Sequence, residues 1–338
     1  MSGGVDSSVS AVLLRQAGYK VVGVFIRVWE PPGYKCPWRE DRREAMRVAA
    51  QLDIPLLTLD LEKEYKHEVV DQMISEYKRG RTPNPDVLCN RSIKFGAFYD
   101  WARQQGADYV ATGHYARVKN GKFLTSKDEK KDQTYFLWNL ANEQLKSVLF
   151  PIGHLTKLAV RQLAKKFKLP NATKPDSQGL CFIGQIDLKD FLGQYLTLKI
   201  GKVLSEKGEI IGTHAGAILY TIGERHGFMV KQKSDQEKPY FVIARDIRQN
   251  TLTVSHNIKH PMFDIIELVK TNWLNDLPVV GKKYQARIRH RGELLPCLIK
   301  VKKTTATVNF LKSPVAPAPG QSVVIYDRQL CLGGGVIQ

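Results

Sequence analysis

The sequence predicts an α/β fold in which a doubly wound parallel sheet forms an N-terminal domain and two small, mostly β domains follow, the last a β-barrel-like unit. Three observations support this. A glycine- and serine-rich loop runs into an apolar helix, apolar strands then alternate with amphipathic helices, and from about Gly201 short strands and turns replace the helical periodicity. A chain of 338 residues also exceeds one typical domain. We expect domains at residues 1–198, 199–259 and 260–338.

The opening loop, Ser2–Ser8 (SGGVDSS), leads directly into the apolar helix Val9–Leu14. Its two glycines leave backbone N–H groups accessible, its serine hydroxyls add donors, and the positive end of the helix dipole favours a phosphate. The lysine of the G-x-x-x-x-G-K-[ST] P-loop is missing. A serine-rich cap on a buried helix is the alternative, but Asp6 in register with the serine pair favours phosphate binding.

The elements that follow alternate between strand and helix. Gly18 ends the first helix, and Lys20–Val28 is typical of a strand buried on both faces. Apolar residues within Ala45–Leu52 have helical spacing, Ile54–Leu61 predicts another strand, and Tyr65–Tyr77 predicts another helix. In doubly wound sheets the ligand site lies beyond the carboxyl ends of the strands, where the opening loop would sit.

The segment Gly80–Asn90 (GRTPNPDVLCN) is a proline-stiffened loop. Pro85 keeps Asn84 out of the α region, so Asp86 and Cys89 should be held on a defined turn. Four cationic residues surround the cysteine and favour its thiolate form: Lys78, Arg79, Arg81 and Arg91. A small buried residue is the alternative for Cys89; the polar, basic setting favours a reactive thiol.

Two further stretches carry polar residues. The predicted strand Ala107–His114 ends in Gly113, which admits a nucleotide closely, whereas His114 could equally be a surface residue. The run Tyr135–Trp138 is typical of core, and the role of the charged tetrad Lys130–Gln133 stays open.

The five cysteines are odd in number, widely spaced and without a C-x-x-C pair: Cys36, Cys89, Cys181, Cys297 and Cys331. This excludes a standard zinc site and a disulfide framework. Cys181 lies in a polar, glycine-bearing loop like that of Cys89, which suggests paired thiol chemistry and a transient disulfide. We expect Cys297 and Cys331 to lie in the core.

The net charge of +18 indicates a polyanionic partner, nucleic acid before membrane, although a merely basic surface is the alternative. Arg287, Arg289 and Arg291 alternate with other residues, so a strand would place three guanidiniums on one face for phosphate contacts. A solvated β face is the alternative there. Gly333–Gly335 predicts a bend. No signal peptide and no apolar run of about 20 residues is visible, so we expect a cytoplasmic protein.

These motifs occur together in one known family. They are Ser2–Ser8, Asn84–Asp86 with Cys89–Asn90, Ala111–Tyr115, Lys131–Gln133, Asp176–Ser177 with Gly179–Gly184 (GLCFIG), and Pro319–Gln321. The chain resembles the bacterial-type tRNA-specific 2-thiouridylases, within the superfamily of PP-loop ATP pyrophosphatases. That superfamily, whose fold is that of the adenine nucleotide alpha hydrolases, has a parallel strand before the opening loop. Because the chain begins at Met1, we expect this strand to be missing.

The resemblance implies roles for individual residues. ATP, with Mg²⁺ on its triphosphate, would lie on Ser2, Gly3, Gly4, Val5, Asp6 and Ser7, with Ile26 and Gly113 near the nucleoside. Asn84, Pro85 and Asp86 would meet the target base, and Asp86 could act as general base. Cys89 would be the nucleophile and Cys181 the persulfide carrier, joined in a transient disulfide. The positions aligned with tRNA contacts are His114, Lys131, Asp132, Gln133, Arg289, His290 and Gln321.

The implied activity is ATP-dependent 2-thiolation of the wobble uridine in tRNAs for Lys, Glu and Gln. A sulfur donor, such as a cysteine desulfurase or a relay protein, would be a partner of a monomeric enzyme. An iron–sulfur cluster at Asp86, Cys89 and Cys181 stays open. Two other functions also remain open: another PP-loop ligase or amidotransferase, and a catalytically impaired RNA-binding protein.

Overall fold

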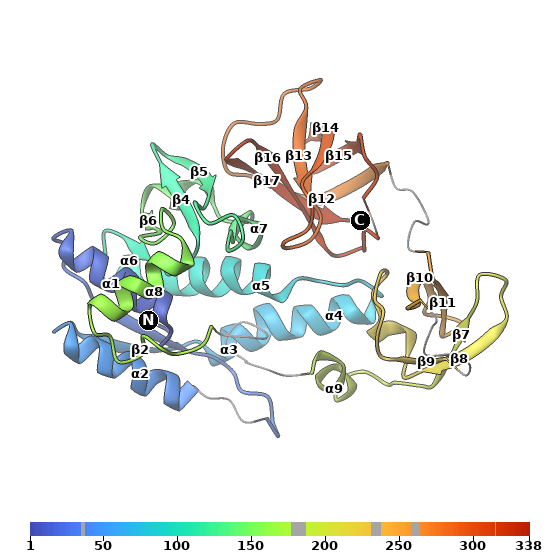
Figure 1. Ribbon diagram of the computed structural model, residues 1–338, viewed down its shortest axis with the longest axis horizontal. Coiled ribbons are helices and arrows are strands. Elements are labelled where there is room, and N and C mark those ends of the chain that lie inside the picture. The colour runs from blue at the N-terminus through green and yellow to red at the C-terminus, as the bar shows by residue number, and fades with distance from the viewer. Residues whose placement is uncertain (35–37, 177–186, 231–237, 258–263, 315) are drawn as a thin grey trace.

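The computed structural model describes residues 1–34, 38–176, 187–230, 238–257, 264–314 and 316–338. Three units follow one another along the chain: an α/β domain at the N-terminus, a central β-sheet domain and a C-terminal barrel (Figure 1). The predicted fold class is confirmed. The motif carrying Cys181 lies outside the described residues, as does Cys36.

The α/β domain contains two pairs of parallel strands, β1 with β2 and β3 with β6. An antiparallel hairpin, β4–β5, follows β3. The strands are β1 (Gly23–Arg27), β2 (Leu56–Asp60), β3 (Val110–Ala111), β4 (Ala116–Lys119), β5 (Lys122–Thr125) and β6 (Val148–Leu149). The helices are α1 (Val5–Gln16), α2 (Trp38–Gln51), α3 (Glu62–Tyr65), α4 (Gln72–Lys78), α5 (Pro85–Leu88), α6 (Phe98–Gln104), α7 (Thr134–Leu137), α8 (Lys157–Lys166) and α9 (Leu188–Gly193).

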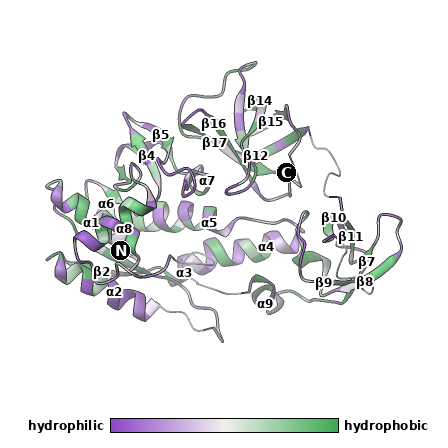
Figure 2. Cartoon of the chain, in the orientation of Figure 1, coloured by the Kyte–Doolittle hydropathy of each residue, from purple (hydrophilic) through white to green (hydrophobic). Residues whose placement is uncertain are grey.

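Apolar spacing along the helices sets how they pack. Val9 and Val12 of α1 share a buried cluster with Val160 and Ala164 of α8, which fixes α8 beside the opening loop. Hydrophilic and hydrophobic residues alternate along α4, as expected of a helix with one apolar face (Figure 2).

Two long helices run from the parallel strands toward the central sheet (Figure 1). The first joins α3 to α4 through a π-helical segment, Lys66–Asp71, and the predicted helix Tyr65–Tyr77 is confirmed. The second joins α5 to α6 through another π-helical segment, Cys89–Ala97. The prediction of a loop over Gly80–Asn90 is therefore wrong from Pro85 onward, because proline at the first helical position starts a helix rather than preventing one.

The central domain is a five-stranded sheet with the strand order β10–β11–β7–β8–β9. Its strands are β7 (Gly201–Leu204), β8 (Ile210–His214), β9 (Phe228–Val230), β10 (Phe241–Asp246) and β11 (Thr251–Ser255). Val203, Val242 and Leu252 face the same cluster as Tyr65 and Val69 of the first long helix. This shared core fixes the sheet to the α/β domain.

The C-terminal domain is a closed six-stranded barrel with the order β12–β15–β14–β13–β16–β17, closed by pairing of β12 with β17. Its strands are β12 (Ile265–Trp273), β13 (Tyr284–Arg287), β14 (Leu295–Lys302), β15 (Thr305–Phe310), β16 (Ser322–Asp327) and β17 (Leu330–Ile337). Cys297 and Cys331 are fully buried, as predicted. Gly333–Gly335 do not form the predicted bend; they lie within β17, where all three pair with β16 and Gly333 and Gly334 also pair with β12.

The predicted row of three arginines on one strand face is wrong. Strand β13 ends at Arg287, and Arg291 has a φ of 59°, so the alternation runs past the strand into a turn. The guanidinium of Arg287 lies 3.7 Å from Asp132, and Arg289 donates to the carbonyls of Ile222 and Ala316. Both guanidiniums therefore have partners within the protein.

The barrel also joins the α/β domain. Strand β5 pairs with β17 at Leu124 and Leu330, so the hairpin β4–β5 continues the barrel sheet. Trp138 of the α/β domain donates from Nε1 to Ser322 Oγ of β16 at 3.0 Å. The predicted core run Tyr135–Trp138 is confirmed, since three of its four side chains are fully buried.

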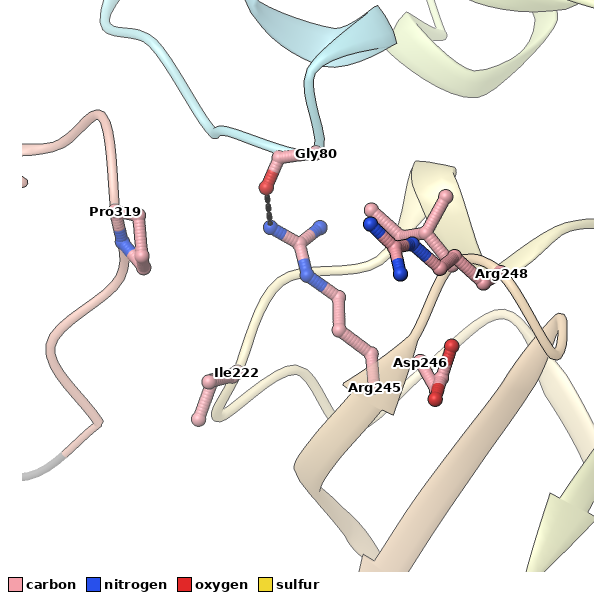
Figure 3. A pocket seen from close by; sticks show the side chains of 7 residues that line it. Gly80, Ile222, Arg245, Asp246, Arg248 and Pro319 are labelled. Atoms are coloured by element: carbon pink, nitrogen blue, oxygen red, sulfur yellow. Dashed lines mark hydrogen bonds between the residues drawn. The ribbon is translucent and has the colours of Figure 1, made fainter.

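A short connector, Gly80–Asn84, lies where the three domains meet. Thr82 N–H donates to the carbonyl of Pro319 at 2.8 Å, and Gln321 Nε2 donates to the carbonyl of Thr82 at 2.9 Å. Arg245 of the central domain donates to the carbonyl of Gly80 at 2.7 Å, beside a cavity of about 390 Å³ (Figure 3). Both β domains thus hold the segment that precedes α5.

Within the described ranges, no helix has the length and apolar character that would be needed to span a bilayer.

Candidate active site

The opening loop forms a cradle at the N-terminus of α1. Gly3 has a φ of +71°, and a Cβ there would lie 2.2 Å from the carbonyl oxygen of Asp41, so only glycine fits. The hydroxyls of Ser7 and Ser8 both donate to the carbonyl of Gly4 at 3.0 Å. The N-cap residue of α1 is Gly4, which has no side chain to cap the helix, so the first-turn N–H groups are left to an anion.

Gly113, predicted to lie near the nucleoside, lies against this cradle. A Cβ on Gly113 would be 2.7 Å from the amide nitrogen of Ser7, so the end of β3 approaches the first turn of α1 directly. Ile26, the other residue predicted near the nucleoside, lies on β1 and packs against the cluster around Tyr65. The close approach to the first turn of α1 thus comes from Gly113.

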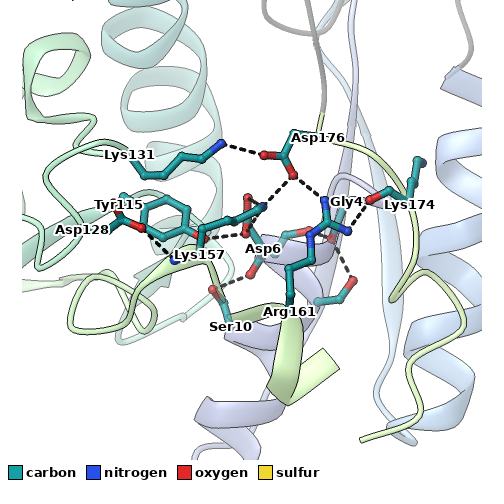
Figure 4. Close-up of polar contacts among 12 residues, drawn as sticks. Gly4, Asp6, Ser10, Tyr115, Asp128, Lys131, Lys157, Arg161, Lys174 and Asp176 are labelled. Carbon is teal, nitrogen blue, oxygen red and sulfur yellow. Dashed lines mark hydrogen bonds and ion pairs between the residues drawn. The ribbon is translucent and has the colours of Figure 1, made fainter. Parts of the chain in front are cut away.

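Asp6, on the first turn of α1, is held by two groups from elsewhere in the chain. Lys157 Nζ of α8 lies 2.7 and 2.8 Å from its two carboxylate oxygens, and Tyr115 Oη donates to Oδ1 at 2.9 Å (Figure 4). Burial and the neighbouring Asp6 charge raise the pKa of Tyr115 far above its ordinary value. Tyr115 therefore remains a proton donor to Asp6.

Asp176 joins three cations beside Asp6. Lys131 Nζ lies 2.7 Å from it, Lys157 Nζ 2.9 Å and the Arg161 guanidinium 2.5 Å (Figure 4). Burial alone would raise the pKa of Asp176, but these hydrogen bonds outweigh it and hold the pKa well below its usual range. The carboxylate is charged at neutral pH, and Lys157 bridges it to Asp6.

Two more side chains brace the loop. Asn171 Nδ2 donates to the carbonyl of Gly3 and to Ser8 Oγ, both at 2.9 Å, while its buried Oδ1 has no partner among the described residues. Lys174 Nζ pairs with Asp41 at 2.6 Å.

Four of these residues were not predicted from the sequence: Asn171, Lys174, Lys157 and Arg161. One signal was present: Lys157 and Arg161 are four residues apart at the start of a helix, which places them on one face.

Asn84 is the N-cap of α5. Its Oδ1 accepts from the amides of Asp86 at 3.1 Å and Val87 at 3.3 Å, and its own backbone is extended, as Pro85 requires. Cys89 lies one turn further and is fully buried, in the same apolar cluster as Phe191. The expected loop position of Asp86 and Cys89 is thus corrected: both belong to a helix, and Cys89 is buried, as in the alternative considered for it.

The partner proposed for Cys89, Cys181, lies in the segment 177–186 outside the described residues. The residues on both sides of this segment are described. Asp176 lies beside the opening loop, and α9, which starts at Leu188, packs Phe191 into the cluster of Cys89.

His114 is buried next to Gly113 rather than on the surface. Its Nδ1 is 2.9 Å from Thr112 Oγ1, and its Nε2 is 3.5 Å from Lys94 Nζ. Burial, together with the charge of Lys94, lowers the pKa of His114 well below its ordinary value. The imidazole is therefore neutral at physiological pH.

The tetrad Lys130–Gln133, left open by the sequence, supports the same region. Asp132 is buried and accepts from Ser126 N–H at 2.8 Å and Thr134 Oγ1 at 2.6 Å, and burial raises its pKa despite these bonds. Gln133 Oε1 accepts from Tyr115 N–H at 2.9 Å. Lys131, through Asp176, and Gln133, through Tyr115, both reach the Asp6 network.

The remaining predicted tRNA contacts lie at the domain junction. Arg289 donates to Ala316 O at 2.6 Å, and Gln321 holds the connector through Thr82. His290 stacks at 4.3 Å from Phe136, and burial plus the charges of two neighbouring arginines lower its pKa to about 4. The residues predicted to contact tRNA therefore lie in two places, one near the opening loop and one at the domain junction.

No group of three His, Cys, Asp or Glu side chains that could hold a metal ion occurs in the part of the chain that the structure describes. A cluster on Asp86, Cys89 and Cys181 would need a ligand from outside that part.

Comparison with known families matches the chain in three consecutive parts. Residues 1–185 match the family described as "tRNA methyl transferase HUP domain", residues 189–256 match "tRNA methyl transferase PRC-barrel domain", and residues 263–337 match "Aminomethyltransferase beta-barrel domain". These three parts correspond to the α/β domain, the central sheet and the barrel.

Curated relatives extend over the whole chain. The protein of Nitrosomonas eutropha named tRNA-specific 2-thiouridylase MnmA is 44% identical over 348 residues, covering 100% of this chain and 96% of its own. The MnmA of Streptococcus sanguinis is 43% identical, covering 100% and 93%. The MnmA 1 of Geobacillus kaustophilus is 46% identical, covering 100% and 94%. Because these relatives match all three domains together, their shared name is more specific than the separate domain descriptions, and the chain belongs to the tRNA-specific 2-thiouridylase family.

Proposed function

We propose that the protein is an ATP-dependent sulfurtransferase that replaces the 2-oxygen of the wobble uridine in tRNA, in acceptors for Lys, Glu and Gln, with sulfur. The observation that carries this proposal is the uncapped N-terminus of α1, preceded by a Ser-Gly-Gly loop and closed from one side by Gly113. A triphosphate is the kind of anion that such a cradle accepts. The names of the full-length relatives support the choice of tRNA and sulfur.

The first half-reaction activates the uridine. The uracil 2-oxygen attacks the α-phosphorus of ATP, pyrophosphate leaves, and the proton on N3 is lost, which gives an O-adenylated base. The backbone donors of Ser2–Ser7 stabilise the charge that develops on the departing phosphates. Mg²⁺ enters as part of the substrate, on the phosphates of ATP.

The second half-reaction transfers sulfur. The terminal sulfur of a Cys181 persulfide bonds to carbon 2, and AMP leaves. The Cys89 thiolate then attacks Cys181 Sγ, the sulfur–sulfur bond breaks, and its electron pair stays on the sulfur bound to carbon 2. The products are 2-thiouridine and a Cys89–Cys181 disulfide, which a thiol reductant opens. No step uses an iron–sulfur cluster.

The Asn84 cap supports the proposal that Asn84, Pro85 and Asp86 meet the target base. It holds this turn in one conformation at the start of the helix that carries Cys89. A uridine in the anticodon loop is single-stranded and can leave its stack to reach such a turn. A sulfur donor, such as a cysteine desulfurase or a relay protein, loads Cys181.

The test is mass spectrometry of nucleosides from uridine-containing tRNA incubated with the protein, Mg²⁺, ATP and a persulfide-generating desulfurase. We expect 2-thiouridine and one AMP for each thiolated uridine, and neither when α,β-methylene ATP replaces ATP. Cys181→Ser should abolish the product without altering circular dichroism. Pyrophosphate release that does not depend on tRNA would instead indicate another PP-loop ligase, and tRNA binding without any ATP turnover would indicate an RNA-binding protein.

A further inference from the structure

The opening loop lacks the lysine that phosphate-binding loops of the G-x-x-x-x-G-K-[ST] type carry within their own motif. The fold brings a lysine to the same place from 151 residues further along the chain, because Lys157 Nζ contacts the Asp6 carboxylate. The ammonium therefore lies at the edge of the cradle that the first turn of α1 leaves open.

The position of Lys157 is fixed at both ends of its side chain. Its backbone N–H donates to Asp128 Oδ2 at 2.8 Å, and Thr156 caps α8 by accepting from Ala159 N–H at 3.2 Å. Its side chain is only 15% exposed. The ammonium bonds three carboxylate oxygens, two of Asp6 and one of Asp176. Such a side chain loses little further rotamer freedom when it binds an anion.

The neighbouring charges allow the Lys157 ammonium to exchange a carboxylate acceptor for a phosphate. Asp176 already receives Lys131 at 2.7 Å and Arg161 at 2.5 Å, and Asp6 also receives the hydroxyl of Tyr115. Asp6 and Asp176 therefore keep other donors if the Lys157 ammonium turns to a phosphate. An incoming triphosphate replaces the Asp6 oxygens as acceptors of the Lys157 ammonium without leaving Asp176 unpaired.

We propose that Lys157 is a catalytic residue that binds the phosphates leaving as pyrophosphate and stabilises their charge as the bond to the α-phosphorus breaks. This assignment rests on the proposed function for its reaction. Asp6 and Asp176 hold the ammonium in place before the nucleotide arrives. Lys157 thus supplies, from α8, the phosphate-binding lysine that the loop motif itself does not contain.

The experiment compares the wild type with Lys157→Gln and Lys157→Arg, and uses Lys165→Gln as the control, since Lys165 is an exposed lysine on the same helix. Three quantities are measured: the Kd of pyrophosphate by calorimetry, the Kd of ATP with Mg²⁺, and the tRNA-dependent rate of pyrophosphate release. We expect Lys157→Gln to bind pyrophosphate about 10- to 100-fold more weakly, because a charge-assisted hydrogen bond is lost. Its rate should fall about 100- to 1,000-fold.

Lys157→Arg should recover part of the pyrophosphate affinity, and Lys165→Gln should match the wild type. A residue that only ties α8 to α1 would change thermal unfolding but leave pyrophosphate affinity unchanged in the folded variant, and that result would overturn the assignment. If the wild type binds pyrophosphate, Lys157→Gln does not, and no 2-thiouridine forms on tRNA, the role of Lys157 stands and the proposed function fails. If the wild type binds neither nucleotide nor pyrophosphate, both fail.

Discussion

His114 shows how burial makes a single residue sensitive to acid. The folded protein keeps its imidazole neutral, because burial and Lys94 lower its pKa, whereas the unfolded chain takes up a proton near pH 6.5. As the pH falls below 6.5, the unfolded state binds more protons than the folded state, so stability decreases. From pH 7.5 to 5.5 this group alone should remove about 1.4 kcal/mol of unfolding free energy.

Urea unfolding at the two pH values checks this. His114→Gln should lose about 1.4 kcal/mol less than the wild type on acidification. His154 is an exposed histidine, and His154→Gln is the control variant. An unchanged pH dependence in His114→Gln would mean that this imidazole is not held neutral.

Cys89 tests the sulfur half of the proposed reaction. Cys89→Ala should reduce 2-thiouridine formation to background, since no other described cysteine lies on α5 or its continuation. Cys297→Ala, at an equally buried position in the barrel, should retain most of the activity. The readout is nucleoside mass spectrometry alongside thermal unfolding of each variant. Wild-type rates in Cys89→Ala would exclude a thiol role at this position.

At the residue scale, the role of a side chain could be predicted where the residues that interact with it are close to it in the sequence. The Ser2–Ser8 cradle and the restriction of Asn84 by Pro85 are properties of short segments. The burial of Cys89 could not be predicted, because the cluster that it joins also draws residues from the first long helix, α9 and the central sheet. Lys157 was missed for the same reason, since its partner Asp6 is 151 residues away.

At the scale of elements, the Asn84 cap positions the helix that begins at Pro85. Asn84→Ala should cost about 1 kcal/mol of stability, because two amides lose their acceptor. Thiolation should fall at least tenfold, as Asp86 and Cys89 shift with the frayed turn. Asn84→Ser restores a capping oxygen but not the amide. Full recovery of both stability and activity in Asn84→Ser would show that the residue acts only as a cap and does not meet the base.

Whether a segment is a helix or a strand could be predicted well from the sequence, whereas the residue at which it ends could not. The long helix marked by Tyr65–Tyr77 exists because its apolar spacing continues for several turns. The arginine alternation around Arg289 predicted a strand that ends earlier, since a period of two over a few residues also arises by chance in a turn. Gly333–Gly335 predicted a bend, yet crowded neighbouring strands need residues without side chains at that place.

At the scale of the molecule, the connector Gly80–Asn84 should report how firmly the domains are held together. Gln321→Ala removes the bond to Thr82 and should cost about 1 kcal/mol. Amide exchange at Thr82 should accelerate, while the affinity for ATP should stay unchanged, because the bonds that hold Gly80 and Thr82 come from the central domain and the barrel. Gln249→Ala, at an exposed position in the central domain, is the control. Unchanged exchange at Thr82 would show that the barrel does not hold the connector through Gln321.

The order of the three domains could be predicted, because the pattern of predicted elements changes along the sequence from alternating helices and strands to strands alone. The contacts that join the domains could not be predicted. Strand β5 meets β17 at a single pair, Leu124 and Leu330, and no local pattern encodes a contact over that distance.

That joint bears on how the chain is made. Phe123, Tyr135 and Trp138 of the α/β domain share one buried cluster with Val324 and Cys331 of the barrel. During synthesis the α/β domain emerges before the strands that complete this cluster, β16 and β17. The aromatic side chains of the domain that holds the opening loop therefore stay uncovered until those strands have been made. Chaperone dependence should be greatest in that interval, because the core of the α/β domain is complete only when the barrel has formed.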